Sequence, residues 1–335
     1  MFLWGAKVQK TAYLGIFDYM TKHSTNLLTI LGPTAAGKTA FSAQLAHRLD
    51  GEIISADSRQ VYRGMDIGTG KDYEDYIVDG QQIPVHLIDI LEAGFEYNVY
   101  LFKQDFFRVL TDISDRGKLP VLCGGSGLYL ESVIKNYRLL KVPPDEALRA
   151  RLEAKDIAEL EGILKLYGPL HNQTDLTSRK RIIRAIEIAA SQSGKIDTPE
   201  DEETLNPLVL GVQLERSVRR KRITERLRKR LEEGLVEEVE GLMEQGVSAE
   251  KLDYYGLEYR YVSRYVLKEM SYDNMVERLN SAIHQFAKRQ MTYFRGMERR
   301  GTKIHWIDGD LALEEMTNEA LSLCRSILNI PGDLN

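Results

Sequence analysis

The sequence predicts an α/β protein with a P-loop parallel sheet core, a helical insertion domain and a helical C-terminal half. Two observations carry this prediction. Short apolar runs with strand character alternate with helix-like segments in the first part of the chain, which is typical of a doubly wound parallel sheet. The Gly-rich segment 32–39 lies between one such run and a helix-like segment, the position of a phosphate-binding loop in this fold.

The individual elements follow from hydrophobic spacing and from helix start and stop signals. Helical spacing covers 38–49 and 99–116, and it resumes from 217 to about 295. Between these regions, Val142-Pro143-Pro144-Asp145 is a helix-start signal; residues 145–193 are predicted to be wholly helical, and the acidic loop 197–207 follows. The predicted strands cover 26–31, 52–56, 83–90, 119–123 and 208–214.

These boundaries divide the chain into a core and an insertion. The core comprises 26–140 and 206–315, and the helical insertion covers 141–205. Residues 1–25 are expected to form an N-terminal extension, since they contain no hydrophobic segment followed by a small-residue cleavage site. No apolar run approaches the roughly 20 residues needed to span a bilayer, so we expect no membrane segment.

Composition and charge exclude several classes of protein. Of the 335 residues, 43% are hydrophobic and 28% are charged, which excludes a disordered tail, a collagen-like repeat and a small disulfide scaffold. The net charge of −5 means that a polyanionic partner needs local basic patches. Cys123 and Cys324 are far apart and match no zinc-ligand spacing, so we expect a reducing compartment, the cytoplasm.

A complete phosphate-loop motif is the strongest single signal. The segment Gly32-Pro33-Thr34-Ala35-Ala36-Gly37-Lys38-Thr39 fits G-x-x-x-x-G-K-[ST] and has the expected strand–turn–helix context. Its backbone N–H groups and the Lys38 ammonium favour bound phosphates, and the Thr39 hydroxyl can hold Mg²⁺. ATP is the usual ligand of such a nucleotide-binding loop, but any diphosphate would fit.

An acidic residue follows the second predicted strand. Asp57 lies just after 52–56, and the carboxyl ends of parallel strands border the ligand crevice. A carboxylate at that place can act as a base toward an incoming nucleophile. The alternative is an aspartate that only stabilises the next turn.

Several ordered motifs together resemble the tRNA dimethylallyltransferases, also called tRNA isopentenyltransferases. The resemblance covers roughly residues 26–310, in the family's order. The matching segments are GPTAAGKT (32–39), SADSRQVYRGMDIGTGK (55–71), HLIDI (86–90), GGSGLYL (124–130), RAIE (184–187), RITERL (222–227) and AKRQMTYFR (287–295).

The resemblance implies a reaction and its partners. A dimethylallyl group passes from dimethylallyl diphosphate to N6 of adenosine 37 in tRNAs that read codons beginning with U, with Mg²⁺ as cofactor. In this scheme Asp57 is the base, and Ser126, where the family usually has Thr, hydrogen-bonds the reacting adenine. The alternative for Ser126 is simple capping of the following helix. We expect a monomer that binds the tRNA anticodon stem-loop.

The resemblance also implies the binding residues. The catalytic set is Asp57, Ser126, Lys38, Thr39 and Arg226. The diphosphate set is residues 32–39 (Gly32, Pro33, Thr34, Ala35, Ala36, Gly37, Lys38, Thr39) with Arg222 and Arg226, which share a helix face. The tRNA set is Asp57, Ser58, Arg59, Gln60, Ser126, Arg149, Lys180, Arg181, Ile182, Ile183 and Arg184.

Basic clusters at 179–184, 216–230 and 288–300 suit a polyanion, although each alone fits a solvated helix face. The tyrosines at 254–265 suit base stacking or packing equally. Three segments depart from the family pattern and fall where it contacts tRNA: GLEYR (256–260), with two apparent extra residues, His284 in place of the usual Arg, and HNQTDLTSRKR (171–181).

Three other functions share parts of the pattern. An isopentenyltransferase for free adenine nucleotides would use the same loop and Asp57, but would leave the basic helical region 141–300 without a role. A small-molecule kinase also places an acid after the second strand, and dependence on ATP would identify it. A tRNA-binding relative without activity disagrees with the intact Lys38, Thr39 and Asp57.

Overall fold

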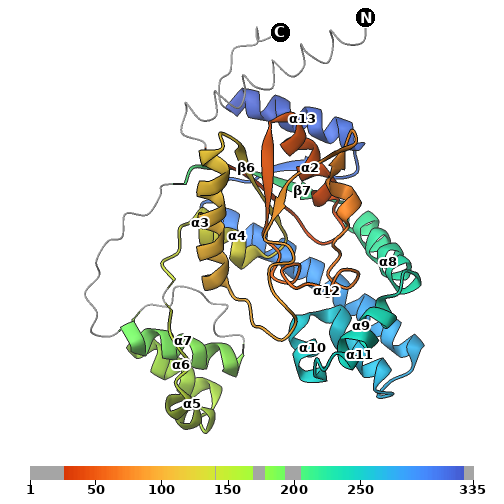
Figure 1. Ribbon diagram of the computed structural model, residues 1–335. Coiled ribbons are helices and arrows are strands. Elements are labelled where there is room, and N and C mark those ends of the chain that lie inside the picture. Colours follow the sequence, from red (N-terminus) through yellow and green to blue (C-terminus); the bar gives the residue numbers. More distant parts are fainter. Residues whose placement is uncertain (1–25, 140, 169–177, 193–204, 328–335) are drawn as a thin grey trace, which may run out of the picture. The chain divides into compact units, whose positions relative to one another are not determined.

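We describe the protein from a computed structural model that covers residues 26–139, 141–168, 178–192 and 205–327 (Figure 1). The expected N-terminal extension, 1–25, lies outside these ranges. The chain divides into two compact units. Of the described residues, 26–137 and 205–327 form the core unit, and 138–139, 141–168 and 178–192 form the small unit.

A six-stranded sheet forms the centre of the core unit, and the predicted α/β fold class is confirmed (Figure 1). Every neighbouring pair of strands is parallel, and the strand order is β5-β2-β6-β1-β7-β8. The strands are β1 (Leu27–Leu31), β2 (Gly51–Ser55), β5 (Val85–His86), β6 (Leu119–Gly124), β7 (Pro207–Gln213) and β8 (His305–Asp308).

Helices cover both faces of the sheet, which is why β1 and β2 are buried along their full length. On one face α2 (Lys38–Arg48) and α13 (Leu313–Ile327) enclose a core that includes Leu28, Ile30 and Phe41. On the other face α3 (Val99–Asp115), α4 (Gly127–Ile134) and α12 (Tyr272–Arg299) contribute to a larger core. The carboxyl ends of the strands therefore form an edge that both layers flank.

The C-terminal half of the core unit is helical, as expected. It contains α8 (Arg216–Glu232), α9 (Leu235–Glu244), α10 (Ala249–Tyr255), α11 (Leu257–Val266) and the 28-residue α12. Helix α12 buries one stripe of its surface at helical spacing, including Leu279, Ile283 and Phe294, because that stripe faces the core. Gln290 lies within this apolar stripe and has a role at the site.

The structure differs from the sequence prediction at several segments of the core unit. Of the predicted strand 83–90, only Val85–His86 is a strand; Leu87 and Asp89 have positive φ values of 63° and 55°, which an extended strand cannot include. After α12, the chain returns to the sheet as β8 and ends in α13, neither of which the sequence predicted. A short 3₁₀ turn (Tyr73–Tyr76) and the hairpin β3 (Ile77–Val78) and β4 (Gln81–Gln82) were also missed.

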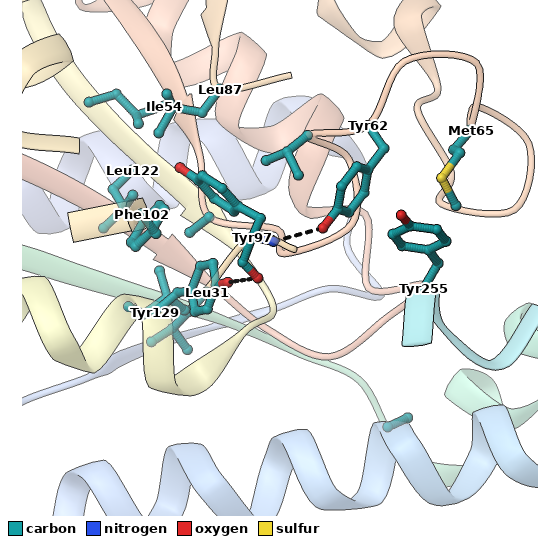
Figure 2. Close-up of a cluster of buried hydrophobic side chains, with 14 of the residues drawn as sticks. Leu31, Ile54, Tyr62, Met65, Leu87, Tyr97, Phe102, Leu122, Tyr129 and Tyr255 are labelled. Atoms are coloured by element: carbon teal, nitrogen blue, oxygen red, sulfur yellow. Dashed lines mark hydrogen bonds between the residues drawn. The ribbon is translucent and has the colours of Figure 1, made fainter. Parts of the chain in front are cut away.

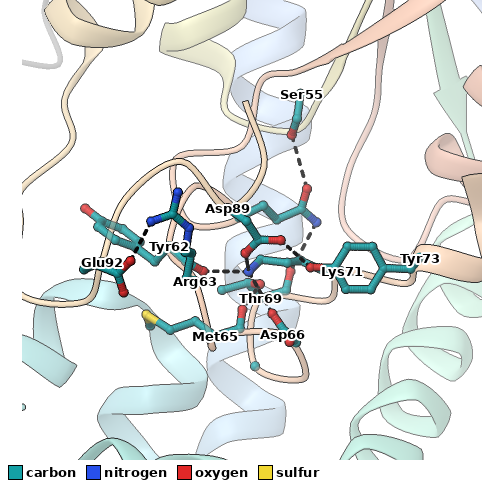
Figure 3. Close-up of polar contacts among 12 residues, drawn as sticks. Ser55, Tyr62, Arg63, Met65, Asp66, Thr69, Lys71, Tyr73, Asp89 and Glu92 are labelled. Carbon is teal, nitrogen blue, oxygen red and sulfur yellow. Dashed lines mark hydrogen bonds and ion pairs between the residues drawn. The ribbon is translucent and has the colours of Figure 1, made fainter. Parts of the chain in front are cut away.

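The positive φ values at Leu87 and Asp89 bend the chain, and this bend brings the motif segment 86–90 against the motif segment 55–71 (Figure 3). The side chain of Lys71 is fully buried, and its Nζ donates to the Tyr62 carbonyl at 2.6 Å and to Asp66 at 2.8 Å. Asp89 completes the cluster by accepting from Lys71 and from the Tyr73 hydroxyl. Since a buried ammonium needs carboxylate partners, this cluster fixes segment 66–73 against the sheet edge.

A cluster of tyrosines belongs to the larger core of the core unit (Figure 2). The N–H of Tyr97 donates to the Tyr62 hydroxyl oxygen at 2.9 Å, and the rings of Tyr62 and Tyr255 lie 4.6 Å apart edge to face. Tyr255 and Tyr259 are buried in this core, so these two tyrosines serve packing and are not exposed to stack on RNA bases.

The small unit is helical but not continuously so. Its helices are α5 (Glu146–Glu153), α6 (Ile157–Leu166) and α7 (Arg179–Gln192), so the prediction of one helical run over 145–193 was wrong at 154–156. Asp156 starts α6 with a capping box to Glu159, which interrupts the run. Buried leucines and isoleucines form the unit's own core. In the part of the chain that the structure describes, no helix has the length and hydrophobicity needed to cross a membrane.

Candidate active site

The phosphate-loop motif forms the turn between β1 and α2. Its backbone needs left-handed conformations at Ala35 (φ 61°) and at Gly37 (φ 81°), which precedes the first turn of α2. A Cβ on Gly32 would lie 2.7 Å from the Val212 carbonyl oxygen, so only glycine lets the loop pass this close to β7. The first turn of α2 therefore presents its backbone N–H groups and the side chains of Lys38 and Thr39 at the sheet edge.

Lys38 folds back over the loop and donates from Nζ to the Pro33 carbonyl at 2.8 Å. Mainly desolvation, with a smaller contribution from neighbouring Arg226, lowers the pKa of Lys38 to about 8, although Cys123 and Asp57 act in the opposite direction. A bound anion would stabilise the charged form. The site is therefore built so that an anionic ligand completes the environment of Lys38.

Arg226 reaches the loop from α8. Its Nη2 donates to the Thr34 hydroxyl at 2.7 Å, across 192 residues of sequence. Desolvation lowers the pKa of Arg226 to about 10, and the nearby Arg230 guanidinium lowers it too, while Asp72, Glu258 and Asp57 oppose the shift. The structure thus brings two predicted catalytic cations, Lys38 and Arg226, to the same loop.

Gln290 of α12 joins the phosphate loop to the turn before α4. Its Oε1 accepts from the Thr34 N–H at 2.8 Å, and its Nε2 donates to the Gly125 carbonyl at 3.0 Å. A Cβ on Gly125 would come within 2.5 Å of Nε2, so glycine makes room for this bridge. The sequence prediction gave Gln290 no role; a polar residue in the buried stripe of α12 was the available signal.

Asp57 lies immediately beyond β2, as the strand-edge argument predicted. Its Oδ1 accepts from the Arg59 N–H at 2.8 Å, so the turn-stabilising alternative is also realised. The charge of Asp57 acts on the pKa values of Lys38, Arg226 and Cys123, so the carboxylate lies within electrostatic range of these groups. The hydrogen bond to the Arg59 N–H uses only Oδ1 of Asp57. Oδ2 can therefore accept a proton while Oδ1 stabilises the turn.

Ser126 occupies the residue before α4, but its side chain does not cap that helix. Its Oγ instead accepts from the Ser58 N–H at 3.4 Å. The simple capping alternative for Ser126 is therefore not what the structure contains. Gly127 packs under the ring of Tyr293, which holds this turn against α12.

The segment after Asp57 is fixed by its neighbours. Gln60 donates from Nε2 to the Gly70 carbonyl at 2.9 Å, and its Oε1 accepts from the Ser55 hydroxyl (Figure 3). The Arg59 guanidinium lies 4.5 Å from the centroid of the Tyr254 ring. Both contacts orient side chains that the sequence prediction assigned to tRNA.

The hydrogen bonds of Arg222 go to the turn after β8 rather than to the phosphate loop. Its Nη1 donates to the Gly309 carbonyl and its Nη2 to Asp310, both at 3.1 Å, in the turn that follows β8. Arg222 and Arg226 share a helix face as expected, but β8 supplies partners for Arg222 that the sequence did not reveal. Its expected role at the diphosphate stays a prediction.

The other predicted tRNA residues belong to the small unit. Glu187, 1% exposed, accepts from both Arg149 at 2.8 Å and Arg184 at 3.0 Å, so these arginines are internally paired. Ile182 and Ile183 are buried in the unit's core and cannot present their side chains to a ligand. Lys180 and Arg181 have exposed side chains.

The donor set suits Mg²⁺ rather than a transition metal. Within the described residues, no group of three or more His, Cys, Asp or Glu side chains forms a metal cage. Mg²⁺ usually takes one or two protein oxygens and completes its shell with water and substrate phosphates. The Thr39 hydroxyl beside the loop, with Asp57 nearby, fits this pattern.

The chain is similar in sequence to known proteins. The sequence profile described as IPP transferase matches residues 60–297. The tRNA dimethylallyltransferase 1 of Parabacteroides distasonis is 55% identical over 292 residues, 87% of this chain and 95% of that protein. The tRNA dimethylallyltransferase 2 of Bacteroides fragilis is 54% identical over 302 residues, 89% of this chain and 97% of that protein.

Solved structures give the same result. The full-length tRNA isopentenylpyrophosphate transferase of Bacillus halodurans is 31% identical, with a TM-score of 0.67 over 91% of this chain and 97% of that one. A eukaryotic dimethylallyltransferase acting on tRNA has a TM-score of 0.72 over 91% of this chain and 79% of that one. At 21% identity, the second comparison supports the fold alone.

Proposed function

Because this chain belongs to the IPP transferase family, we propose that it transfers a dimethylallyl group from dimethylallyl diphosphate to N6 of adenosine 37 in tRNAs that read codons beginning with U. It is a transferase that modifies tRNA. The observation that carries the proposal is the convergence of Lys38, Arg226 and Asp57 on one loop at the sheet edge. The cytoplasm and a monomeric state are parts of the same proposal.

The phosphate loop binds and stabilises the leaving group. As the bond between C1 of the allyl group and the diphosphate oxygen breaks, negative charge grows on the diphosphate. The N–H groups of the loop, the Lys38 ammonium and the Arg226 guanidinium stabilise that charge in a desolvated site, where each contact is stronger than in water. The same groups serve a diphosphate as well as they would serve ATP.

Asp57 removes the proton from the nucleophile. An exocyclic adenine amine is a poor nucleophile and becomes acidic only as its nitrogen forms the new bond to C1. A carboxylate in reach accepts the N6 proton at that stage, a contribution of about 10²–10⁴ in rate for general bases. Ser126, whose hydroxyl is not used to cap α4, is available to hydrogen-bond the reacting base.

Mg²⁺ belongs to the proposal as a cofactor. Bound at the Thr39 hydroxyl with diphosphate oxygens, it would neutralise charge on the leaving group. The protein's own contribution is to orient the diphosphate through Lys38 and Arg226, and to keep the loop in place through Gln290.

The tRNA partner is part of the same proposal. Adenosine 37 is stacked in the anticodon loop, so its N6 becomes accessible only when the base is turned out of the stack. Arg59, Lys180 and Arg181 are our candidates for contacts to that loop, since single-stranded RNA is held through stacking and phosphate contacts.

A transfer assay separates this function from the alternatives. The protein is incubated with radiolabelled dimethylallyl diphosphate, Mg²⁺ and bulk tRNA, with AMP and ATP as parallel acceptors. Label in tRNA alone supports the proposal. Label in AMP or ATP indicates a free-nucleotide transferase, and ATP-dependent phosphate transfer without label indicates a kinase.

A further inference from the structure

Arg230 of α8 is a buried arginine with an unmatched donor. Its side chain is 6% exposed, and its Nη2 has no hydrogen-bond acceptor among the residues that the structure describes. The nearest carboxylate, Glu258 of α11, lies 4.0 Å from Nη1, which is the outer limit of an ion pair. Burial of a charged group usually requires strong partners, so this arrangement is incomplete as it stands.

Arg230 shares its environment with Arg226. The two residues are four positions apart on α8 and therefore lie on one face of the helix. Each contributes to the other's surroundings, since the Arg230 charge acts directly on the pKa of Arg226. Arg226 contacts the phosphate loop at Thr34, and Arg230 stands one helical turn further along α8 from Arg226.

The loop below Arg230 leaves room for its guanidinium. Nη2 lies directly over Gly70, where any Cβ would overlap with it. Gly70 has a φ of 70° and accepts from Gln60 through its carbonyl, so this backbone is held in place from the Asp57 segment. The Arg230 guanidinium therefore packs on the bare backbone of Gly70.

Glu258 is the ion-pair partner of Arg230, and its charge also acts on Arg226. Burial raises the pKa of Glu258, and the charges of Arg230 and Arg226 act against that rise. Arg230 thus keeps an unused donor in a desolvated place next to Arg226. A diphosphate is the anion that the neighbouring loop is built to bind.

We propose that Arg230 is a second diphosphate-binding arginine, and that Glu258 is a resident counter-ion which the diphosphate displaces. This inference rests on the proposed function, because it assumes a diphosphate at the phosphate loop. In the free protein Glu258 pairs with Arg230. When diphosphate binds, an Arg230 N–H turns to a diphosphate oxygen, and the pairing with Glu258 is lost.

The direct test is calorimetric titration of inorganic diphosphate, with Mg²⁺, into the full-length protein. We compare the wild type with Arg230→Met, Glu258→Gln and Arg228→Met. Arg228 is exposed on the same helix, so its substitution removes the same charge without the buried contact. We expect Arg230→Met to weaken binding about tenfold or more, as loss of a charge-assisted contact does, and Arg228→Met to change it about twofold or less.

Glu258→Gln should change the diphosphate affinity in the opposite direction. Removal of the competing carboxylate should tighten diphosphate binding about threefold or more, because Arg230 then has no ion pair with Glu258 to break. A purely structural ion pair predicts no tightening. If Arg230→Met fails to fold, as judged by its thermal unfolding, Glu258→Gln alone decides, and unchanged or weaker binding in that variant overturns the inference.

The outcomes distinguish a failure of the Arg230 proposal from a failure of the proposed function. Equal diphosphate affinity in Arg230→Met and Arg228→Met, with normal binding by the wild type, overturns the role of Arg230 and leaves the proposed function intact. Absence of diphosphate binding by the wild type overturns both. Weaker binding in Arg230→Met together with tighter binding in Glu258→Gln supports the displacement.

Discussion

The backbone N–H of Thr34 donates to the side-chain oxygen of Gln290, which lies 256 residues later in the chain. Through the same side chain, the phosphate loop is connected to the turn that carries Ser126, since Gln290 also donates to the Gly125 carbonyl. One amide thus sets the spacing between the leaving-group site and the turn expected to hold the adenine.

Gln290→Met should weaken both the fold and the site. The substitution keeps the volume but leaves the Thr34 N–H and the Gly125 carbonyl without partners, at a cost of about 1–3 kcal/mol in the free energy of unfolding. We also expect a higher KM for dimethylallyl diphosphate. Urea unfolding and initial rates measure the two effects. Gln285→Met, on the exposed side of α12, is the control, and equal behaviour of the two variants would contradict the bridging role.

Asp57→Asn should separate chemistry from binding. The amide oxygen can still accept from the Arg59 N–H, so the turn is preserved, but the side chain no longer takes a proton. We expect transfer to fall by about 10²–10⁴, with tRNA affinity unchanged within a few-fold. Asp57→Ala should lose transfer as well. Single-turnover transfer and filter binding measure these quantities, and loss of tRNA binding in the asparagine variant would make Asp57 a recognition residue instead.

Diphosphate binding should weaken above about pH 8. Lys38, with its pKa lowered to about 8 by desolvation, is protonated below that pH and neutral above it in the free protein. A bound diphosphate favours the protonated form, so binding between pH 8 and 9.5 should take up a proton. Titration calorimetry in buffers of different ionisation enthalpy measures that uptake. Lys38→Met should abolish it, and a wild type with no uptake would contradict the assignment.

The same shift affects stability with a definite sign. In the unfolded chain Lys38 keeps its proton up to its ordinary pKa of 10.5, whereas the folded protein releases it near pH 8. Between these values the unfolded state binds more protons, so Lys38 makes the protein more stable as pH rises through this window. The difference in stability between wild type and Lys38→Met, measured by urea unfolding at pH 7 and pH 10, should therefore become more favourable to the wild type at the higher pH.

Lys71→Met should destabilise the core unit strongly. Lys71 is fully buried between Asp66 and Asp89, so its removal leaves two carboxylates without their cation, at a cost of about 3–5 kcal/mol (Figure 3). Lys118→Met is the matched control, because Lys118 pairs with Asp50 on the surface and should contribute about 1 kcal/mol or less. Chemical unfolding of both variants tests the contrast, and similar losses would contradict it.

Local features were predictable from the sequence, and long-range contacts were not. The loop 32–39 and Asp57 follow directly from strands that a short apolar run reveals, so the sequence placed them at the sheet edge. Gln290 depends on how α12 packs across the core, which no local pattern specifies. Arg222 shows the same limit: it shares the face of Arg226, but β8, an unpredicted strand, brings Gly309 and Asp310 to it. In the same way, the bend at Asp89 depends on its contact with Lys71, and a hydrophobic pattern alone reads that segment as a strand.

Affinity for tRNA should fall steeply with salt, because phosphate contacts release counterions from the RNA. The side chains of Lys180 and Arg181 are both exposed at the start of α7. We therefore expect Lys180→Gln and Arg181→Gln each to reduce the slope of log K against log salt by about 0.7, the value for one contact to a single strand. Lys165→Gln, on the exposed side of α6, should leave the slope unchanged. Filter binding between low and moderate salt measures these slopes.

A flat salt response in the wild type would exclude phosphate contacts as the main source of tRNA affinity. Equal slopes in all variants would mean that the contact surface lies away from the start of α7.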